Sequence, residues 1–318
     1  MFTFVLRRIL SSIPVLLAVT LLVFTLVELA PGDVADYFIN PEGGTSPEAL
    51  AEMRRAYGLD RSPPVRYAIW LGQVVQGDLG FSFVSGEPVI AMILRRFLNT
   101  ALLMSVALVV SVVVGVGLGV FTAVRQYSFW DHALSALSFL AVSMPAFVTG
   151  ILALYLFAVL LPIFPSGGIR SVGVDAGLWN RIHHLILPAG VLALGQTATF
   201  MRYTRFSVLE VLRADYVRTA RGKGLTERRV TMRHGLPNAL IPVITVVGLS
   251  LPVLVVGAVF TETIFSWPGM GTLYLSAVNS RDVPLVMGLN LFIAVVVLAA
   301  NLLTDLTYGL VDPRIRYE

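Results

Sequence analysis

The 318-residue sequence contains no cysteine, and only 13% of its residues are charged. Without thiols the chain cannot form disulfides, use a thiolate nucleophile or bind zinc through sulfur. With only four histidines, we expect no metal cage inside the protein. Soluble domains carry roughly 25% charged residues, whereas here 56% of the residues are hydrophobic and the mean hydropathy is +0.81. These values predict a membrane protein.

Catalytic signatures are missing as well. The sequence has no HExxH, no GxSxG and no acid–base pair inside an apolar run. Gly222-Lys223-Gly224 lacks the rest of the GxxxxGK[ST] phosphate loop, so we expect no nucleotide hydrolysis. We therefore expect no catalytic residue, metal or bound cofactor in this chain. The net charge of +4 does not indicate nucleic acid either, because the arginines cluster beside apolar runs and report membrane topology.

Six apolar runs are candidates to cross a bilayer, which takes about 20 residues. They are 9–30, 101–124, 133–161, 185–201, 238–260 and 285–303. The first is longer than the core of a signal peptide, about 7–15 residues, so we expect it to remain as a spanning helix. Pro145 should kink or break the overlong third run, and Pro188, Pro242 and Pro252 are expected to mark further irregular backbone. The prediction is an all-α polytopic membrane protein.

A long polar segment, 31–98, follows the first run. Ser46-Pro47-Glu48 predicts the start of a helix that Gly58 stops. Pro63-Pro64 precede a second amphipathic stretch, 65–76, which ends at Gly77-Asp78. We expect this segment to form a small ordered cap.

The basic residues predict the orientation. With a cytoplasmic N-terminus, fourteen lysines and arginines fall in cytoplasmic segments and three in the two short outer loops. Cytoplasmic loops are enriched in such residues. We therefore expect both termini and the basic loop 207–237 in the cytoplasm, and the 31–98 cap on the outer side.

Within the basic loop, the pattern predicts two short helices. Asp215 is expected to cap helix 216–223, with Gly224 as its left-handed stop. Thr226 is expected to cap a second helix that ends near His234, before Gly235 and Pro237. Such capping favours a docking element.

Small residues at 220, 222 and 224 would let a partner approach the backbone. Tyr216 and Leu225 offer apolar anchors, and the arginines suit an acidic rim. The alternative is a merely solvated basic loop, and composition alone leaves the two interpretations nearly even.

Polar residues inside the fourth run, at 196, 197 and 199, are candidates to face a translocation path, although such residues also hold helices together. Glu28 and Asp305 are weaker candidates because they lie near run ends. His183-His184 fit an interfacial role better than a metal relay. The glycines of 115–119 predict close helix packing rather than dinucleotide binding.

The basic loop resembles the cytoplasmic signature of ABC importer permeases: EAA, three residues, G, nine residues, I-x-LP. With Gly224 on the signature glycine, residues 218–220 stand on EAA, and His234, Leu236 and Pro237 on I-x-LP. The Glu, the first Ala and the Ile are unmatched. DYVRTARxKGL followed by RHxLxNALIPV is typical of the dipeptide/oligopeptide/nickel permease family, from which this chain departs at Gly222 and Pro237.

The resemblance extends along the whole chain. Segment 179–188 is most similar to oligopeptide members. Other matching segments are 7–8, 29–33, 57–60, 77–82, 265–271, 281–282 and 312–316.

This resemblance implies the type I ABC importer permease fold, with six transmembrane helices in the cytoplasmic (inner) membrane of a prokaryote. The expected organisation is a first helix 1–30, an extracytoplasmic cap 31–98 and a five-helix core 99–318 that contains the coupling loop 207–237. The implied partners are a homologous second permease in a heterodimer, two P-loop ATPase subunits that bind ATP and Mg, an extracytoplasmic solute-binding protein and membrane lipid. The implied activity is import of di- or oligopeptides by alternating access.

The resemblance also implies two sets of functional residues. The ATPase-coupling set is Asp215, Tyr216, Arg218, Thr219, Ala220, Arg221, Gly222, Lys223, Gly224, Leu225 and Pro237. The candidate pore or gate set is Gln196, Thr197, Thr199, Trp267, Pro268 and Gly269.

Three alternatives stay open at this point. The same family also imports nickel, glutathione and other small solutes. An ion-coupled secondary transporter would require inverted repeats and buried carboxylates near the midplane, and neither is evident in the sequence. An intramembrane enzyme lacks its catalytic groups. We expect Ala220→Glu to insert normally but to abolish substrate-stimulated ATPase activity.

Overall fold

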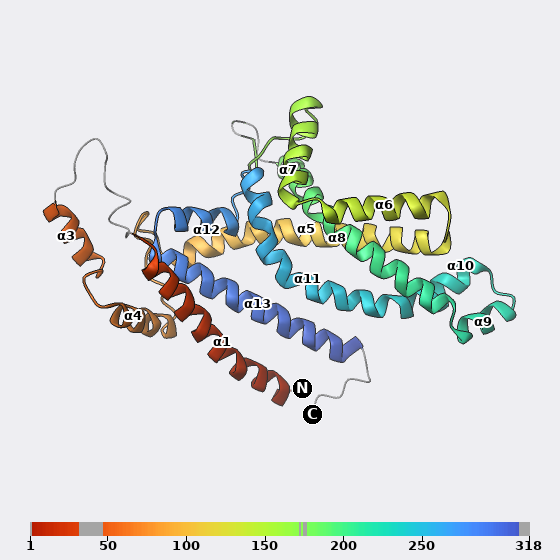
Figure 1. Ribbon diagram of the computed structural model, residues 1–318, viewed down its shortest axis with the longest axis horizontal. Helices are drawn as coiled ribbons and strands as arrows, with labels where there is room; N and C mark the ends of the chain where they lie inside the picture. Colours follow the sequence, from red (N-terminus) through yellow and green to blue (C-terminus); the bar gives the residue numbers. More distant parts are fainter. Residues whose placement is uncertain (1, 32–46, 172, 174–176, 312–318) are drawn as a thin grey trace. The chain divides into compact units, whose positions relative to one another are not determined.

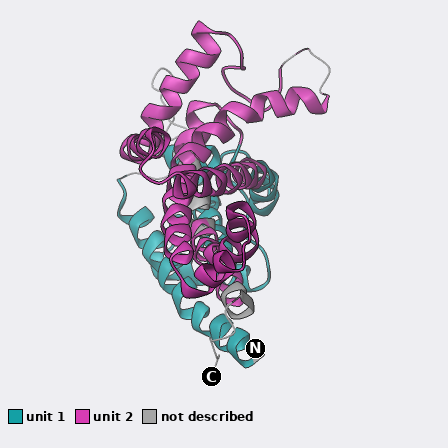
Figure 2. Ribbon diagram, turned by 90° about the vertical axis from the view of Figure 1, so that its right-hand side faces the viewer, with its two compact units in different colours: residues 1–99, 269–299 teal, residues 100–268, 300–318 magenta. Residues whose placement is uncertain are grey.

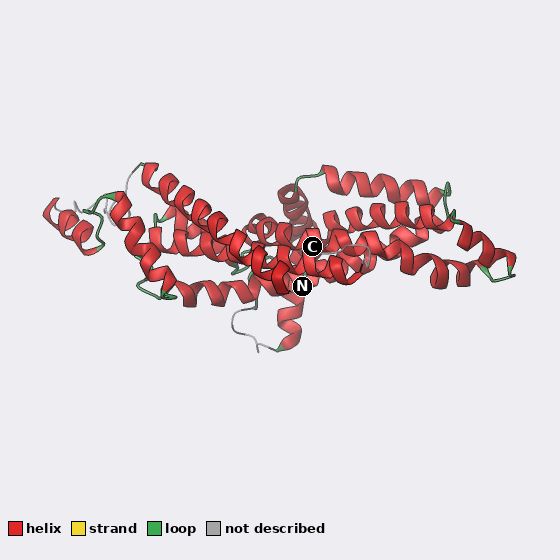
Figure 3. Cartoon of the chain, turned by 90° about the horizontal axis from the view of Figure 1, so that it is seen from below, coloured by secondary structure: helices red, strands yellow, loops and turns green. Residues whose placement is uncertain are grey.

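A computed structural model describes residues 2–31, 47–171, 173 and 177–311 of the chain. Within these ranges every regular element is a helix, apart from one isolated β-bridge between Phe81 and Pro88 (Figures 1 and 3). The α-helices are α1 (Phe2–Leu29), α3 (Pro47–Ala56), α4 (Pro63–Val75), α5 (Val89–Val124), α6 (Phe129–Ser143), α7 (Ala146–Leu154), α8 (Leu178–Leu212), α9 (Asp215–Gly222), α10 (Glu227–Arg229), α11 (Leu236–Ile264), α12 (Met270–Asn279) and α13 (Val283–Val311). Two π-helical turns, η1 (Tyr155–Leu160) and η2 (Val230–Gly235), follow α7 and α10. The matching segments 32–33 and 312–316, and Ser46, lie outside the described residues.

Within the part of the chain that the structure describes, four helices are long and apolar enough to cross a membrane: α1, α5, α8 and α13. The pair α6 and α7 adds a fifth candidate if it forms one broken span. Helix α11 is 29 residues long, but its side chains at 251–258 lie outside the described residues. The all-α prediction is confirmed, and the count of six spans stays a prediction.

The expected break at Pro145 is present. Helices α6 and α7 meet there at an angle of 104°. Met144 is extended, with φ −82° and ψ 128°, because the ring of a following proline disfavours the helical conformation. Helix α8, in contrast, continues through Pro188, and α11 continues through Pro242. The irregular backbone predicted at these two prolines therefore does not break either helix. Neighbouring helices can satisfy the backbone groups that a proline frees.

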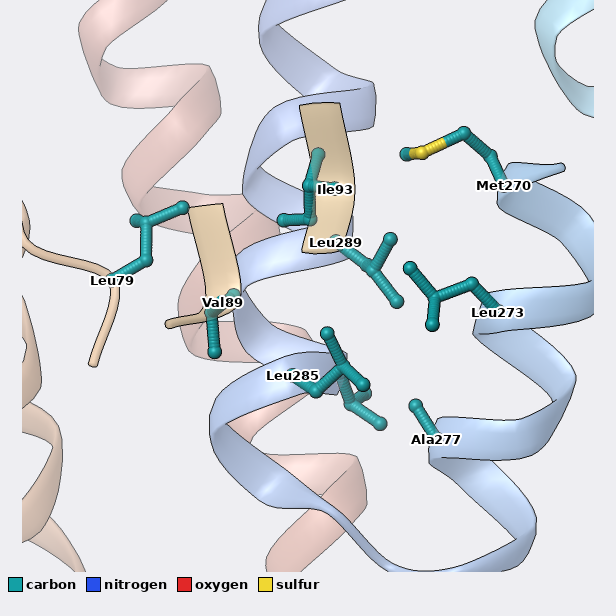
Figure 4. Close-up of a cluster of buried hydrophobic side chains, with 9 residues drawn as sticks. Leu79, Val89, Ile93, Met270, Leu273, Ala277, Leu285 and Leu289 are labelled. Carbon is teal, nitrogen blue, oxygen red and sulfur yellow. The ribbon is translucent and has the colours of Figure 1, made fainter. Parts of the chain in front are cut away.

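The chain divides into two compact units, residues 1–99 with 269–299 and residues 100–268 with 300–318 (Figure 2). In the first unit, side chains from the start of α5, from α12 and from the start of α13 converge on one apolar cluster (Figure 4). Its labelled members are Leu79, Val89, Ile93, Met270, Leu273, Ala277, Leu285 and Leu289. Gly288 completes this packing, because a Cβ there would lie 2.5 Å from Val89 Cγ1.

The predicted cap helices are present in the first unit. Helix α3 ends at Ala56, before Gly58 with φ +67°, and α4 begins at Pro63 and is followed by Gly77 with φ +82°. Helix α4 is fastened to α1 by Arg66, which donates to Glu28 with N–O distances of 2.9 and 3.1 Å. Glu28 is thus paired with the cap within its own unit.

The second unit is a set of helices packed around α8. The predicted close approach of the glycine run is confirmed: a Cβ on Gly115 would lie 2.6 Å from Phe200 Cβ, and one on Gly119 would lie 2.6 Å from Thr204 Cβ. Gly117 meets no atom within 4 Å, so only two of the three glycines face α8. Small residues on one face of α5 therefore let its backbone lie directly against α8.

Candidate functional site

Helix α9 forms much as its sequence predicts. Asp215 lies in the first turn, where its charge suits the positive helix end, and Ala214 rather than Asp215 occupies the N-cap position. The helix ends at Gly222, and Gly224 follows with φ +76°, the left-handed conformation that glycine adopts without strain. The predicted start is therefore displaced by one residue, and the predicted stop is confirmed.

The second short helix differs from its prediction. Thr226 is its N-cap residue, but no stop follows His234, because the π-helical turn η2 leads directly into α11. Pro237 sits in the first turn of α11, where a missing N–H costs no hydrogen bond. Proline here begins the long helix instead of ending the short one.

A small apolar core holds the loop together. It consists of Val217, Ala220 and Val230, with Leu225 packed against them. Ala220 is only 6% exposed, so its small side chain serves packing inside the loop and not the approach of a partner. The exposed surface of α9 is formed instead by Asp215, Tyr216, Arg218, Thr219, Arg221 and Gly222, and Lys223 and Gly224 beyond its end are exposed as well.

Polar contacts fasten this surface to two long helices. The Arg221 guanidinium donates to both carboxylate oxygens of Glu227, at 2.8 and 3.3 Å, and to the carbonyl oxygen of Leu212 at the end of α8. Asn238 in the first turn of α11 donates to the Tyr216 hydroxyl at 3.2 Å. These hydrogen bonds join α9 to the end of α8 and to the first turn of α11.

Two adjoining cavities lie between α7 and α8. One, of about 290 Å³, is lined by Gln196 and Thr199 of α8 and by Thr149 of α7. The other, of about 370 Å³, is almost entirely apolar. They share four lining residues, Met144, Thr149, Val191 and Leu194. Volumes of this size suit a small organic ligand.

The remaining pore candidates lie elsewhere. The backbone of Thr197 faces α5, because its carbonyl oxygen would lie 2.9 Å from a Cβ on Gly115. Trp267 is fully buried and packs with Leu103, Leu185 and Ala189. Pro268 is half-buried at the end of the second unit, and Gly269 caps α12 in the first unit. The structure thus places only Gln196 and Thr199 at these two cavities.

Sequence reasoning missed two polar contacts that shape the second unit. Arg205 of α8 forms a two-pronged ion pair with Asp131 of α6, at 2.7 and 2.9 Å. Ser128 caps α6 by accepting from the Asp131 backbone N–H, a serine-to-acid spacing that was visible in the sequence. The pair fixes the helix that leads into the Pro145 bend.

The second missed contact is Glu262, which is fully buried near the end of α11 and accepts from the Thr100 hydroxyl at 2.5 Å. No pattern in its own helix indicated a buried acid.

The histidines have structural partners. His184 is buried, with Nδ1 3.0 Å from the Gly167 carbonyl oxygen and Nε2 3.1 Å from the Ser171 hydroxyl. His183 Nε2 lies 2.8 Å from the carbonyl oxygen of Ile163. Both rings therefore hold the segment before α8, and in the described part of the chain no cluster of three or more His, Cys, Asp or Glu residues is placed to hold a metal ion.

The second unit thus combines a broken pair of apolar helices, a long helix beside two cavities and a compact helical loop fastened to two long helices. Two family models match nearly the whole chain. Residues 115–317 match the binding-protein-dependent transport system inner membrane component, and residues 1–105 match the N-terminal region of such components.

Curated relatives agree along their full length. The oligopeptide transport system permease protein AppB of Bacillus subtilis is 42% identical over 318 residues, which is 100% of both chains. The dipeptide transport system permease protein DppB of Escherichia coli K12 is 39% identical, also over 100% of both chains. The chain therefore belongs to the family of binding-protein-dependent transport system inner membrane components.

A solved structure supports the fold. The MetNI methionine ABC transporter, in inward-facing conformations, aligns with a TM-score of 0.57 at 16% identity, over 70% of this chain and 97% of its own. At that identity the likeness concerns the fold, which is that of an ABC importer membrane subunit.

Proposed function

We propose that this chain is one of two homologous permease subunits that carry di- or oligopeptides across the membrane. The observation that carries the proposal is the full-length match to permeases named for oligopeptide and dipeptide transport. The paired cavities beside α8 support it: one wall offers the amide of Gln196 and hydroxyls for a peptide backbone, and the apolar wall tolerates varied side chains.

The proposed topology places both termini and the α9 loop in the cytoplasm, with the α3–α4 cap outside. Fourteen basic residues against three favour this orientation. The proposed partners are a second permease in a heterodimer, an extracytoplasmic solute-binding protein and two ATPase subunits, which bind ATP and Mg. The chain itself then performs no hydrolysis.

The proposed coupling surface is the exposed side of α9. Closure of the ATPase subunits would push on this surface, and the Arg221 and Tyr216 contacts would pass the movement to α8 and α11. Because Gln196 and Thr199 belong to α8, the same movement would change the cavity. We assign Thr197, Trp267, Pro268 and Gly269 to the gate as a proposal that rests on the family resemblance.

Substitution of Gly222 tests the coupling surface. A Cβ at Gly222 meets no atom within 4 Å, so Gly222→Ala fits the fold and also removes a helix-destabilising glycine. Gly222→Trp adds bulk to the exposed surface alone. We expect both variants to insert and assemble. The alanine variant should keep substrate-stimulated ATPase activity, and the tryptophan variant should lose most of it. Normal stimulation in the tryptophan variant would exclude α9 as the contact.

Because Ala220 is buried, a substitution at this position does not test contact with a partner alone. Ala220→Glu would place a charge among Val217 and Val230, so a loss of activity would follow from a damaged loop as readily as from a blocked partner. Gly222 separates these two causes because its surroundings are open.

The substrate is tested with the assembled transporter in sealed vesicles. Uptake of labelled peptides that requires ATP and the binding protein would support peptide import. A binding protein that retains nickel or glutathione instead would move the chain to another branch of the same family. Uptake driven by a proton gradient without ATP would favour a secondary transporter.

A further inference from the structure

A shallow groove of about 570 Å³ lies on the loop that joins α9 to α11. It is lined by Thr226, Arg228, Arg229, Met232, Arg233 and Pro237. Three arginines thus share one concave surface, and each of them is exposed. Arg229 and Arg233 are four residues apart, a spacing at which like charges on a helix repel. A bound anion would remove that repulsion.

The groove arginines differ in their partners from most other arginines of the second unit near α9. Most of those other arginines contact an acidic or aromatic side chain of the same chain. Arg205 pairs with Asp131 and Arg221 with Glu227, whereas Arg125 and Arg202 lie over phenylalanine rings at 4.6 and 5.4 Å. Among the described residues, Arg228, Arg229 and Arg233 have no such ion pair or ring contact. Arg213, exposed and outside the groove, shares this property.

Position along the chain indicates what the groove contacts. Arg233 precedes the first residue of α11 by three positions and Arg228 by eight, so at about 1.5 Å per residue they lie about 4.5 and about 12 Å from the start of that apolar helix. The headgroup layer on each side of a bilayer is roughly 5–8 Å thick. If α11 enters the membrane at its start, the Arg233 end of the groove therefore lies within the headgroup layer and the Arg228 end lies just beyond it.

We propose that this groove binds the phosphate headgroup of an anionic phospholipid in the cytoplasmic leaflet. The proposal rests on the cytoplasmic orientation given under the proposed function. Arginine guanidinium groups donate paired hydrogen bonds to phosphate oxygens. Met232, half of whose surface is exposed at 52%, provides an apolar contact beside them for the lipid chain. Basic clusters directly cytoplasmic of a spanning helix attract such lipids.

A bound lipid at this place would act on coupling. The groove runs from α10 through η2 to the first turn of α11, and η2 also carries Val230, a member of the core beneath α9. A lipid held there would steady the loop in the orientation in which α9 is presented. We expect anionic lipid to raise the ATPase activity of the assembled transporter.

The test uses phosphatidylglycerol and phosphatidylcholine as probes. Retention of each lipid by the full-length chain in mild detergent is measured by native mass spectrometry, for the unaltered protein and two variants. The combined variant R228Q/R229Q/R233Q should retain phosphatidylglycerol about a hundredfold more weakly, since each arginine near the surface contributes about fivefold. The matched control R213Q removes one exposed, unpaired arginine outside the groove and should shift retention by about fivefold or less.

Two results would overturn the inference. Equal retention of phosphatidylglycerol by the triple variant and the unaltered protein would exclude the groove, and so would a loss in R213Q as large as in the triple variant. ATPase assays in phosphatidylcholine nanodiscs, with and without phosphatidylglycerol, separate this outcome from a failure of the proposed function. Lower activity of the triple variant in both lipids, with unchanged lipid retention, would assign the groove to the ATPase subunits. Lipid retention by the chain alone does not depend on coupling, so it stands even if α9 is not the ATPase contact.

Discussion

The close packing of α5 on α8 predicts opposite effects of two neighbouring substitutions: Gly119→Ala should destabilise the protein, and Gly117→Ala should stabilise it. In Gly119→Ala the new Cβ would lie 2.6 Å from Thr204 Cβ and 2.7 Å from the Met201 carbonyl oxygen. Optimal carbon contacts lie at about 3.5–4.0 Å, so the helices must separate by roughly 1 Å. One of the two obstacles is backbone, which cannot rotate away.

The expected cost follows from this overlap. Overpacking of a tight interior typically costs about 1–3 kcal/mol, and the backbone contact places Gly119→Ala in the upper part of that range. Gly117→Ala provides the control, because its Cβ meets no atom within 4 Å. That change should stabilise the helix by about 0.5–1 kcal/mol, since alanine loses less backbone freedom than glycine. The two substitutions, two residues apart, should therefore change the free energy of unfolding in opposite directions.

Reversible unfolding in mixed micelles, titrated with a denaturing detergent and followed by tryptophan fluorescence, measures both effects. A separation of α8 from α5 should also disturb the cavity wall formed by Gln196 and Thr199, so Gly119→Ala should raise the KM for transport. Equal stability of Gly119→Ala and the unaltered protein would refute the packing argument. Equal destabilisation by Gly117→Ala would refute the assignment of the two helix faces.

Three further changes have definite expected outcomes. Asp131→Ala leaves Arg205 without its partner and should lower the free energy of unfolding by about 2–3 kcal/mol, less than for a fully buried pair because the arginine is 28% exposed. A double-mutant cycle with Arg205→Leu in the same unfolding assay measures the energy of the pair, and additive effects of the two substitutions would contradict it. Gly224→Ala forces φ +76° on a residue with a Cβ and should cost about 1 kcal/mol, visible as faster hydrogen exchange in α9 than in the unaltered protein. Asp282→Asn weakens the hydrogen bond from the Ser82 hydroxyl and should lower stability by about 1.5–3 kcal/mol, so a protease should cut segment 78–88 faster. Unchanged cleavage would show that this contact does not hold the segment.

Several features of the protein could be predicted because they depend on neighbours in the chain. The break at Pro145 follows from the geometry of proline and the residue before it. The end of α9 follows from Gly224, and the close packing of α5 from glycines four residues apart. The family likewise follows from motifs spread along the chain.

Other predictions failed where local signals competed. Pro237 was expected to end a helix, yet it begins α11, because a proline is compatible with the first turn as well as with a stop. The sequence around Pro237 is compatible with both a helix stop and a helix start. The structure shows a start because the π-helical turn η2 leads directly into α11, and Val230 of that turn packs against Val217 and Ala220 of α9.

Local features of the chain are enough to predict the membrane class, the family and the order of the helices, since apolar runs, caps and motifs act over a few residues. The folded structure alone sets which side of each helix is used. It turned Ala220 inward and left Gly222 exposed, and it set Thr199 at a cavity and Thr197 against α5. These choices depend on contacts between residues far apart in the chain, and those contacts leave no periodic signal in the sequence.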